Sequence, residues 1–428
     1  MEPMLRFKAD DGSEFPAWEE KMFWDVFANL TNNTLSRECL NAESGQARNI
    51  HYGDVLVKYG AVVDVQRDGA PFVNPDVECK RWDCLKDGDV VIADTAEDET
   101  VGKAVEISNA GSDIVYSGLH TIACRPKEEF APGYLGNYIN SMSYHDQLRP
   151  YMQGIKVTSV SKTNIGLTHL LVPSLPEQRK IADLLSAVDD VISTQEAEVA
   201  AWEKRKKGVM QKLFSQEVRF KADDGSDFPD WEERTFADVF IKLRNNTLSR
   251  DCLNAESGQA RNIHYGDVLV KYGSIVDIQN NQVPFVNSDV ECKHWDRLKD
   301  GDIVIADTAE DDSVGKAVEV TNIGSDVVYS GLHTIACRPR ESFARNYLGY
   351  YMNSDAYHDQ LRPYMQGIKV TSVSKGNIAL TRMSVPSLPE QRKIADCLAS
   401  LDDVIAKAKG ELDAWRELKK GLLQQMFV

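Results

Sequence analysis

The segment 151–162, YMQGIKVTSVSK, combines an amide, two lysines, several hydroxyls and a flexible glycine. A glutamine side chain can form two hydrogen bonds with the edge of an adenine base. Lysine, serine and threonine side chains suit phosphate oxygens. Side chains of these types could contact a nucleic acid, and the candidates in this segment are Gln153, Lys156, Thr158, Ser159 and Lys162.

A second polar stretch, QARNIHY at 46–52, offers side chains of the same kinds. It is followed by a lysine and a tyrosine at the end of a run that we interpret as a strand. For each residue in both stretches, ordinary surface polarity is the alternative to base contact. The candidate contacts here are Arg48, Asn49, His51, Lys58 and Tyr59.

The chain repeats itself at an offset of 213 residues, so that 6–214 aligns with 219–427 without insertion or deletion. CLNAESGQARNIHYGDVLVKYG at 39–60 returns unchanged at 252–273. Both candidate sets therefore occur twice. Their second copies are Gln366, Lys369, Thr371, Ser372 and Lys375, with Arg261, Asn262, His264, Lys271 and Tyr272.

Sequence motifs that would indicate catalysis are weaker than these candidate binding stretches. Neither a glycine-rich methyltransferase loop with an Asp/Asn-Pro-Pro-aromatic motif nor a Walker A loop occurs in the sequence. The alternation of Asp76, Glu78 and Lys80 could place nuclease-type groups on one strand face. Nuclease carboxylates usually come from two elements, and Pro75 is Ser288 in the second copy. A solvated strand face is the favoured interpretation, with an autonomous metal-dependent nuclease as an alternative.

Two further clusters have plain structural interpretations. The acidic loop at 94–100 could hold a divalent ion through Asp94, Glu97 and Asp98, but an exposed connection between strands is favoured. His120 and Cys124 would share a face of one strand, where a nucleophile pair is conceivable. We interpret their run, GLHTIACRP, as a core strand with buried structural residues. The sequence predicts no metal site and no catalytic residue.

The composition of the chain limits which classes of protein it can belong to. A formal net charge of −17 argues against non-specific binding of nucleic acid by the whole surface. It predicts that DNA binding by this chain is weak unless a partner supplies positive charge. The eight cysteines form no C-x-x-C pair and are interpreted as free thiols. Because there is no long apolar run and no signal peptide, we expect a cytoplasmic protein without a membrane span.

Each copy has two parts. Short β-rich runs such as DGDVVIAD and HYGDVLVKYG, separated by Gly, Asp, Asn and Pro, predict a mixed domain. Helices are expected to flank the strands at 137–150 and 347–363. A long helix follows. The predicted fold class is α+β, with mixed domains at 1–172 and 219–385 and helical segments at 173–218 and 386–428.

Apolar residues in the helical segments recur with 4–3 spacing over five heptads, which is typical of a coiled coil. Lys206 and Lys419 interrupt the stripe and are expected to set the register of the helices or to lie where a partner docks. The simplest arrangement pairs the two helices antiparallel, with the mixed domains related by a pseudo-twofold axis. The alternative is that each helix folds back onto its own domain. The stripe consists of Ile181, Leu185, Val188, Ile192, Val199, Trp202, Val209 and Leu213, and in the second copy of Ile394, Leu398, Leu401, Ile405, Ala408, Leu412, Trp415, Leu422 and Met426.

Several motifs, each present twice, resemble the specificity subunit of type I restriction-modification enzymes. The helices are opened by PSLPEQRKIAD and closed by KKGLLQQMF at 419–427, with KKGVMQKLF at 206–214 in the first copy. FPAWEE at 15–20, FPDWEE at 228–233, GDVLVKYG and GIKVTSVSK are similar to the same family. The resemblance covers essentially the whole chain.

The resemblance implies two target recognition domains, each reading one half of a split site in double-stranded DNA. It implies a noncatalytic subunit without a cofactor of its own. Methyltransferase subunits, of which we expect two, dock on the helices and methylate adenine with S-adenosylmethionine. Restriction and translocase subunits that use ATP and Mg are further partners in the family.

The chain departs from the family because its two recognition domains are nearly identical. Like readers related by a twofold axis see like sequences on opposite strands, so the predicted target is an interrupted inverted repeat. A helix over 177–213 spans about 55 Å. The half-sites should therefore lie roughly one to one and a half DNA turns apart. The competing interpretation is a noncatalytic protein-interaction scaffold with two like binding domains on a rigid coil.

Overall fold

The computed structural model describes residues 3–79, 82–154, 156–292, 294–367 and 369–427. The chain divides into two compact units. Unit 1 comprises Met1–Glu196 with Gly410–Val428, and unit 2 comprises Ala197–Lys409. Each unit joins one of the mixed domains to a part of each long helix.

The two long helices are α6 (Leu175–Phe214) and α12 (Leu388–Met426), in the segments where the heptad stripe predicts them. Each carries proline in its first turn, where the missing N–H costs no hydrogen bond. Within unit 1, Ile181 and Leu185 of the stripe are almost fully buried. The helices therefore form because a narrow apolar face is covered along their length.

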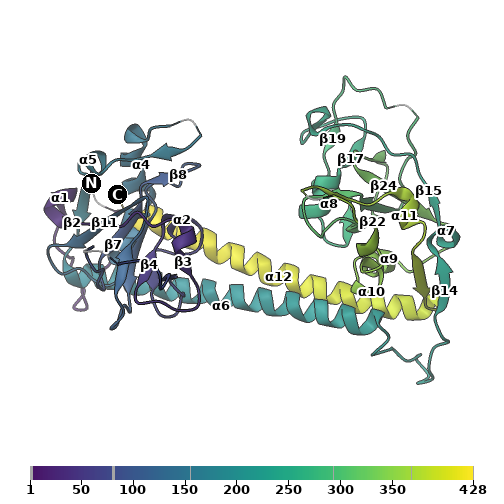
Figure 1. The fold of residues 1–428 in the computed structure, drawn as a ribbon, viewed down its shortest axis with the longest axis horizontal. Coiled ribbons are helices and arrows are strands. Elements are labelled where there is room, and N and C mark those ends of the chain that lie inside the picture. Colours follow the sequence, from purple (N-terminus) through teal and green to yellow (C-terminus); the bar gives the residue numbers. More distant parts are fainter. Residues whose placement is uncertain (1–2, 80–81, 155, 293, 368, 428) are drawn as a thin grey trace. The chain divides into compact units, whose positions relative to one another are not determined.

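The paired helices run antiparallel within each unit (Figure 1). In unit 1, the Lys419 ammonium lies 2.6 Å from Asp189 of α6, and Arg416 lies 2.6 Å from Glu196. The residue numbers fall on one helix as they rise on the other. In unit 2 the same pattern joins Lys206 with Asp402. The two lysines that interrupt the apolar stripe are thus ion-paired across the helix pair.

The start of α6 is fastened to the domain by a buried ion pair. The Glu177 carboxylate is fully buried and accepts hydrogen bonds from Arg6 Nε at 3.0 Å and Nη2 at 2.9 Å. Next to it, the Gln178 side chain accepts from the Ala131 N–H and donates to the Pro173 carbonyl. The Pro-Glu-Gln motif therefore positions the helix against the domain.

A five-stranded sheet forms the centre of each mixed domain. Its strands are mostly antiparallel, apart from one parallel pair at the edge, and three of them are buried along their whole length or nearly so. In unit 1 the order is β2 (Phe27–Leu30), β11 (Thr121–Pro126), β7 (Val90–Ala93), β9 (Ala104–Ser108) and β5 (Val62–Asp64), and in unit 2 it is β15 (Phe240–Lys242), β24 (Thr334–Pro339), β20 (Ile303–Ala306), β22 (Ala317–Thr321) and β18 (Ile275–Asp277).

Smaller sheets complete each domain. The four-stranded sheet of unit 1 has the order β10 (Val115–Ser117), β4 (Arg48–Ile50), β6 (Phe72–Val73), β3 (Leu40–Asn41), and that of unit 2 has the order β16 (Leu253–Asn254), β19 (Phe285–Val286), β17 (Arg261–Ile263), β23 (Val328–Ser330). Each unit also has two two-stranded sheets. In unit 1 they pair β1 (Glu19–Met22) with β13 (His169–Val172) and β8 (Thr95–Ala96) with β12 (Thr158–Ser159). In unit 2 they pair β14 (Glu232–Thr235) with β26 (Arg382–Val385) and β21 (Thr308–Ala309) with β25 (Thr371–Ser372).

Short helices flank the sheets. Those of unit 1 are α1 (Phe23–Val26), α2 (Tyr52–Val57), α3 (Tyr134–Ile139), α4 (Met142–Leu148) and α5 (Lys162–Ile165). Those of unit 2 are α7 (Phe236–Val239), α8 (Tyr265–Val270), α9 (Tyr347–Met352), α10 (Asp355–His358) and α11 (Lys375–Ile378). None of the described helices combines the length and the apolar character that crossing a membrane requires.

The prediction of β structure for HYGDVLVKYG was wrong, because most of this run is the helix α2. His51 caps the helix by accepting the Gly53 N–H at its Nδ1 atom. Asp54 in the first turn is held by Arg37. Val55 is buried, while Val57 is almost fully exposed. The side-chain cap, together with an ion pair between residues far apart in the sequence, outweighs the local β propensity.

The flanking helix expected at 137–150 is present as two pieces, α3 and α4. The helix is interrupted at Asn140, whose side chain accepts a hydrogen bond from the Ala104 N–H and donates one to the Ala104 carbonyl. Ser141 then caps α4 by accepting the Tyr144 N–H. The helix therefore turns where two polar side chains compete for backbone partners.

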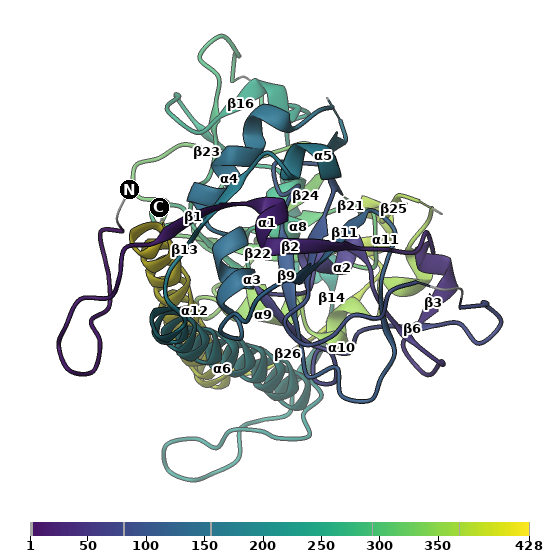
Figure 2. The same cartoon turned by 90° about the vertical axis from the view of Figure 1, so that its left-hand side faces the viewer.

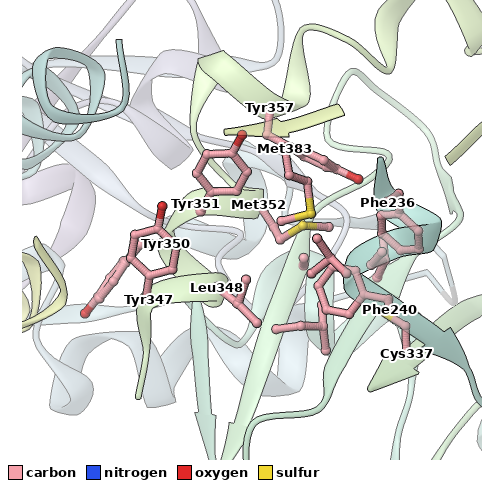
Figure 3. Packing of buried hydrophobic residues seen from close by; sticks show 14 of the residues in the cluster. Phe236, Phe240, Cys337, Tyr347, Leu348, Tyr350, Tyr351, Met352, Tyr357 and Met383 are labelled. Carbon is pink, nitrogen blue, oxygen red and sulfur yellow. The ribbon is translucent and has the colours of Figure 1, made fainter. Parts of the chain in front are cut away.

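Tyrosines of α3 and α9 lie between each sheet and the helix pair. In unit 2, Figure 3 shows Tyr347, Tyr350 and Tyr351 projecting from α9, with Phe236 and Phe240 near Cys337. The end of α6 closes this core, because the Phe214 ring meets the Tyr347 and Tyr351 rings at centroid distances of 6.0 and 5.5 Å. Phe427 at the end of α12 does the same in unit 1, against Tyr134 and Tyr138.

Candidate nucleic-acid interface

The segment first singled out in the sequence forms a tight exposed hairpin. Gln153 and Ser159 exchange two backbone hydrogen bonds, at 3.0 and 2.9 Å. Gly154 has φ +128, and a Cβ there would lie 1.8 Å from the Val157 carbonyl oxygen, so only glycine fits. Gln153, Lys156 and Ser159 are exposed at its surface. Residue 155 lies outside the described part of the chain.

Strand β8 lies beside this hairpin and brings a second polar group to it. Thr158 and Ser159 of β12 pair with Ala96 and Thr95 of β8. The Thr95 hydroxyl donates to Asp94 Oδ1 at 2.7 Å and lies 3.4 Å from Nδ1 of His120. The hairpin is therefore connected through Thr95 to the turn that precedes β11.

His120 stands on that turn and is not part of the core strand. Its backbone has φ +53, a left-handed conformation that histidine adopts more readily than most residues. Its side chain is 47% exposed, and Nδ1 lies 3.5 Å from Asp94 Oδ1. Cys124 lies inside β11 with no exposed surface, and burial raises the pKa of its thiol. The expectation that both residues are buried was wrong for His120, and the two do not form a nucleophile pair.

The first residue of α2 extends the same surface. The Tyr52 ring meets His120 edge to face at a centroid distance of 5.3 Å and lies 4.7 Å from the His51 ring. His51 is nearly buried, and that burial lowers the pKa of its imidazole, with the Arg37 charge acting in the same direction. Arg37 binds Asp54 with two hydrogen bonds, at 2.9 and 2.7 Å, while its side chain stays half exposed.

A lysine at the start of α5 approaches the same turn from the other side. In unit 2, Lys375 Nζ donates to Asn245 Oδ1 at 2.9 Å, and the Asn245 amide donates to the Gly331 carbonyl at 3.2 Å. In unit 1, Asn32 makes the same bond to Gly118 at 3.2 Å, and Lys162 holds the equivalent sequence position. Gly118 permits this packing, because a Cβ there would lie 2.6 Å from Asn49 Nδ2.

We call this surface the polar loop face. In unit 1 it consists of Tyr52, Thr95, His120, Gln153, Lys156, Ser159 and Lys162, and in unit 2 it consists of Tyr265, Thr308, His333, Gln366, Lys369, Ser372 and Lys375. Thr158 and Thr371 are half-buried beneath it in their short strands. Sequence reasoning missed Tyr52 and Thr95. The sequence contains one signal that could have indicated them, because each of these polar loop residues is repeated identically in the second copy.

The second candidate set lies mostly inside the domain. Asn49 and Tyr59 are buried, and burial raises the pKa of the Tyr59 phenol. Arg48 is held by Asp113 at 2.6 Å and stacks over Phe72. Their copies Asn262, Tyr272, Arg261 and His264 are placed alike, and only Lys58 and Lys271 are exposed, each bonded to a nearby backbone carbonyl.

Other chemistry has little support in this region. Across the described ranges, no three His, Cys, Asp or Glu side chains are grouped as a metal site would require. In the loop at 94–100, Asp98 bonds the Thr100 hydroxyl and N–H and is fully exposed. Of the nuclease-type pattern, Lys80 lies outside the described residues.

The family model for the type I restriction modification DNA specificity domain matches residues 229–414. The putative type I restriction enzyme MjaX specificity subunit of Methanocaldococcus jannaschii is 23% identical over 98% of this chain and 95% of its own length. The EcoKI specificity subunit of Escherichia coli K12 is 21% identical over 71% of this chain and 66% of its own length.

Solved structures share the fold. The S subunit of a type I system from M. genitalium aligns with 100% of this chain and 99% of its own, with a TM-score of 0.52 and 14% identity. A chain from structural work on complex assembly and conformational transition of the type I R-M system covers 96% of this chain and 98% of its own, with a TM-score of 0.57 and 17% identity.

A duplicated mixed domain, a polar loop face on each copy and antiparallel helix contacts within each unit characterise the structure. The family model over 229–414 and the curated relatives together indicate a type I restriction-modification specificity subunit, and the solved structures share its fold.

Proposed function

We propose that this chain, as the DNA sequence-specificity subunit of a type I restriction-modification system, reads a split target with its two polar loop faces. The observation that carries the proposal is the return of every residue of one face at the same place in the other unit. Two like surfaces predict two like half-sites, which we expect as an inverted repeat on opposite strands.

The side chains of the face suit separate parts of a DNA groove. Gln153 carries a donor and an acceptor on the exposed hairpin, at the position that pairs with Ser159, which suits an adenine edge. Lys156 and Lys162 provide charge for phosphates. The Tyr52 and His120 rings contact each other edge to face and add two aromatic side chains to the face. We assign base contact to Gln153 and His120 and phosphate contact to the lysines.

Among the residues first considered, those that are buried receive a supporting role. Asn49 accepts a hydrogen bond from Asn33 at 2.6 Å, and Asn33 in turn bonds the Ser117 carbonyl near the turn that carries His120. His51 caps the helix that begins with Tyr52. These side chains hold the polar loop face in shape and do not reach its surface.

Catalysis is assigned to partner subunits. We expect methyltransferase subunits, two per chain, to bring S-adenosylmethionine, and restriction subunits, where present, to bring ATP and Mg. The net charge of −17 also favours this division, because an acidic chain binds DNA well only when a partner supplies positive charge.

The proposal is tested by binding selection. The chain is co-purified with the methyltransferase encoded beside it, and a pool of randomised duplexes is selected on the complex and sequenced. An enriched split motif with matching halves supports the function. Enrichment equal to that of the methyltransferase alone contradicts it and favours a protein-interaction scaffold.

A further inference from the structure

The two units differ in charge along one edge of the five-stranded sheet, where β2 or β15 is the outermost strand. Three exposed positions on this strand or beside its end are neutral in unit 1 and basic in unit 2. We call them the edge positions, which are Asn29, Thr31 and Cys84 in unit 1 and Lys242, Arg244 and Arg297 in unit 2. All three differences therefore change the charge in the same direction.

A shared aspartate ties the edge positions together. In unit 1, Asp83 accepts hydrogen bonds from the Thr31 N–H and hydroxyl, at 2.7 and 2.8 Å. In unit 2, Asp296 accepts from the Arg244 backbone N–H at 2.8 Å and from its guanidinium at 2.9 Å. The third edge position directly follows the aspartate. With the aspartate included, the formal charge of the group is −1 in unit 1 and +2 in unit 2.

Two cations of unit 2 remain after Arg244 has neutralised the aspartate. Among the described residues, neither Lys242 nor Arg297 has an acidic partner within ion-pair distance. The Leu243 N–H continues the strand pairing by donating to the Ala336 carbonyl. Because residues two apart in an extended chain share a face, Lys242 and Arg244 lie on the same side. Unit 2 therefore presents a small basic surface where unit 1 presents none.

The edge positions adjoin the polar loop face. Asn245 directly follows Arg244, and its side chain accepts a hydrogen bond from Lys375 of the face at 2.9 Å. The amide of Asn245 donates to the Gly331 carbonyl at 3.2 Å, in the turn that precedes β24. The extra basic side chains of unit 2 therefore lie next to the side chains that we expect to read bases.

Basic side chains beside a base-reading surface favour contact with DNA phosphates. Such contacts supply a large share of the affinity of a protein for DNA and carry no sequence information directly. In unit 1 the aspartate has no cation among the edge positions and repels the same phosphates. Two faces that read alike should therefore hold their half-sites with unequal strength.

We propose that the edge positions of unit 2 bind the DNA backbone beside its half-site, so that unit 2 engages its half-site first and more tightly than unit 1. This asymmetry rests on the proposed function, in which both units read DNA, and adds an order of binding to it. Base choice is still set by the polar loop faces, whose residues are the same in the two units.

The first test uses the full chain in complex with its methyltransferase and a random-sequence duplex, with affinity measured between about 50 and 200 mM NaCl. Lys242→Asn, Arg244→Thr and Arg297→Ser are combined, because unit 1 carries neutral residues at these positions in the same fold. Each lost phosphate contact lowers the slope of log affinity against log salt by about 0.9. We expect the slope to become shallower by roughly two units in this triple variant.

The converse variant combines Asn29→Lys, Thr31→Arg and Cys84→Arg, and should steepen the slope by a similar amount. The control Arg382→His, measured at about pH 8, also removes a charge from unit 2 and introduces the residue of the first copy. It lies on β26, outside the polar loop face, and should leave the slope unchanged.

An unchanged slope in the triple variant would overturn the proposal. If the wild-type complex still selects a split motif, the proposed function stands without the asymmetry. A wild-type complex that selects no motif contradicts the proposed function itself.

The order of binding is tested on a duplex that carries a single half-site. Because unit 2 should occupy it, Gln366→Ala is expected to weaken binding by about tenfold, while Gln153→Ala changes it by less than about twofold. In the triple variant the two substitutions should have equal effects. Equal effects already in the otherwise unchanged chain would show that the units bind alike and would overturn the proposal.

Discussion

The backbone N–H of Leu5 donates to the carbonyl oxygen of Gln425 at 2.9 Å, so the beginning of the chain is bonded to the end of its last helix. Figure 2 shows α12 and β1 on the same side of unit 1. In unit 2 the equivalent bond, from Val218 to Lys212 at 3.1 Å, lies within the continuous segment that leaves α6. The contacts between chain ends in unit 1 therefore repeat those of a covalent connection in unit 2.

This equivalence predicts that the connection at 215–217 can be cut without loss of structure. A protease site inserted there should yield two fragments that elute together, because each unit keeps its own antiparallel helix contacts. The measurement is size-exclusion chromatography before and after cleavage. Fragments that separate at micromolar concentration would show that the covalent connection is required.

Loss of the buried Glu177 carboxylate should destabilise unit 1. Glu177→Ala leaves Arg6 without its bidentate partner, and we expect a loss of about 3 kcal/mol. Hydrogen exchange of α6 and of the first domain reports the effect locally. The exposed pair of Arg179 with Glu129 provides the control, because Arg179→Ala should change stability by less than about 1 kcal/mol. Equal effects of the two substitutions would refute the anchoring role.

Stability should fall as the pH rises towards neutrality. Burial raises the pKa of Glu106 from 4.5 to about 7, and Glu319 in the second copy behaves alike. The folded state then holds a proton that the unfolded state has released. This contribution is complete below pH 4.5 and is lost as the pH rises through 7, by on the order of 2–4 kcal/mol per site.

Thermal unfolding between pH 4.5 and 8 measures this dependence. The doubly substituted chain, Glu106→Gln with Glu319→Gln, should show a flatter profile, because an amide does not titrate. A wild-type profile that rises with pH over this range would contradict the assignment.

Gln153 should read one half-site. Gln153→Ala is expected to weaken binding of the complex by roughly tenfold or more, through loss of a bidentate base contact. Gln366→Ala should have the same effect on the other half-site, and the exposed Gln46, outside the polar loop face, provides a control. Affinities are measured on duplexes in which one half-site at a time is altered. An unchanged affinity for Gln153→Ala would remove this residue from the contact set.

The repeat, the long helices and their antiparallel pairing could be predicted from the sequence, because each depends on a regular pattern extending over many residues. The hairpin at 153–159 could also be predicted as an exposed polar loop. The helix α2 could not, because it depends on the His51 cap and on the ion pair between Arg37 and Asp54, whose partners are distant in sequence or atypical.

Burial explains why part of the second candidate set does not reach the surface. Asn49 follows an arginine and Tyr59 follows a lysine in the sequence, but both side chains point into the domain and are buried. For His120 the prediction failed in the opposite direction. Its own left-handed backbone conformation places it in an exposed turn and not in the apolar strand that follows. A sequence pattern does not reveal such a single change of backbone direction.

The central claim is that two like readers select two like half-sites. The most direct test is a base-resolution map of adenine methylation in cells that express this chain with its methyltransferase, compared with cells that lack the chain. We predict a split motif whose halves form an inverted repeat and which is absent without the chain. Methylation that does not depend on the chain, or a chain-dependent motif with unrelated halves, would contradict the account.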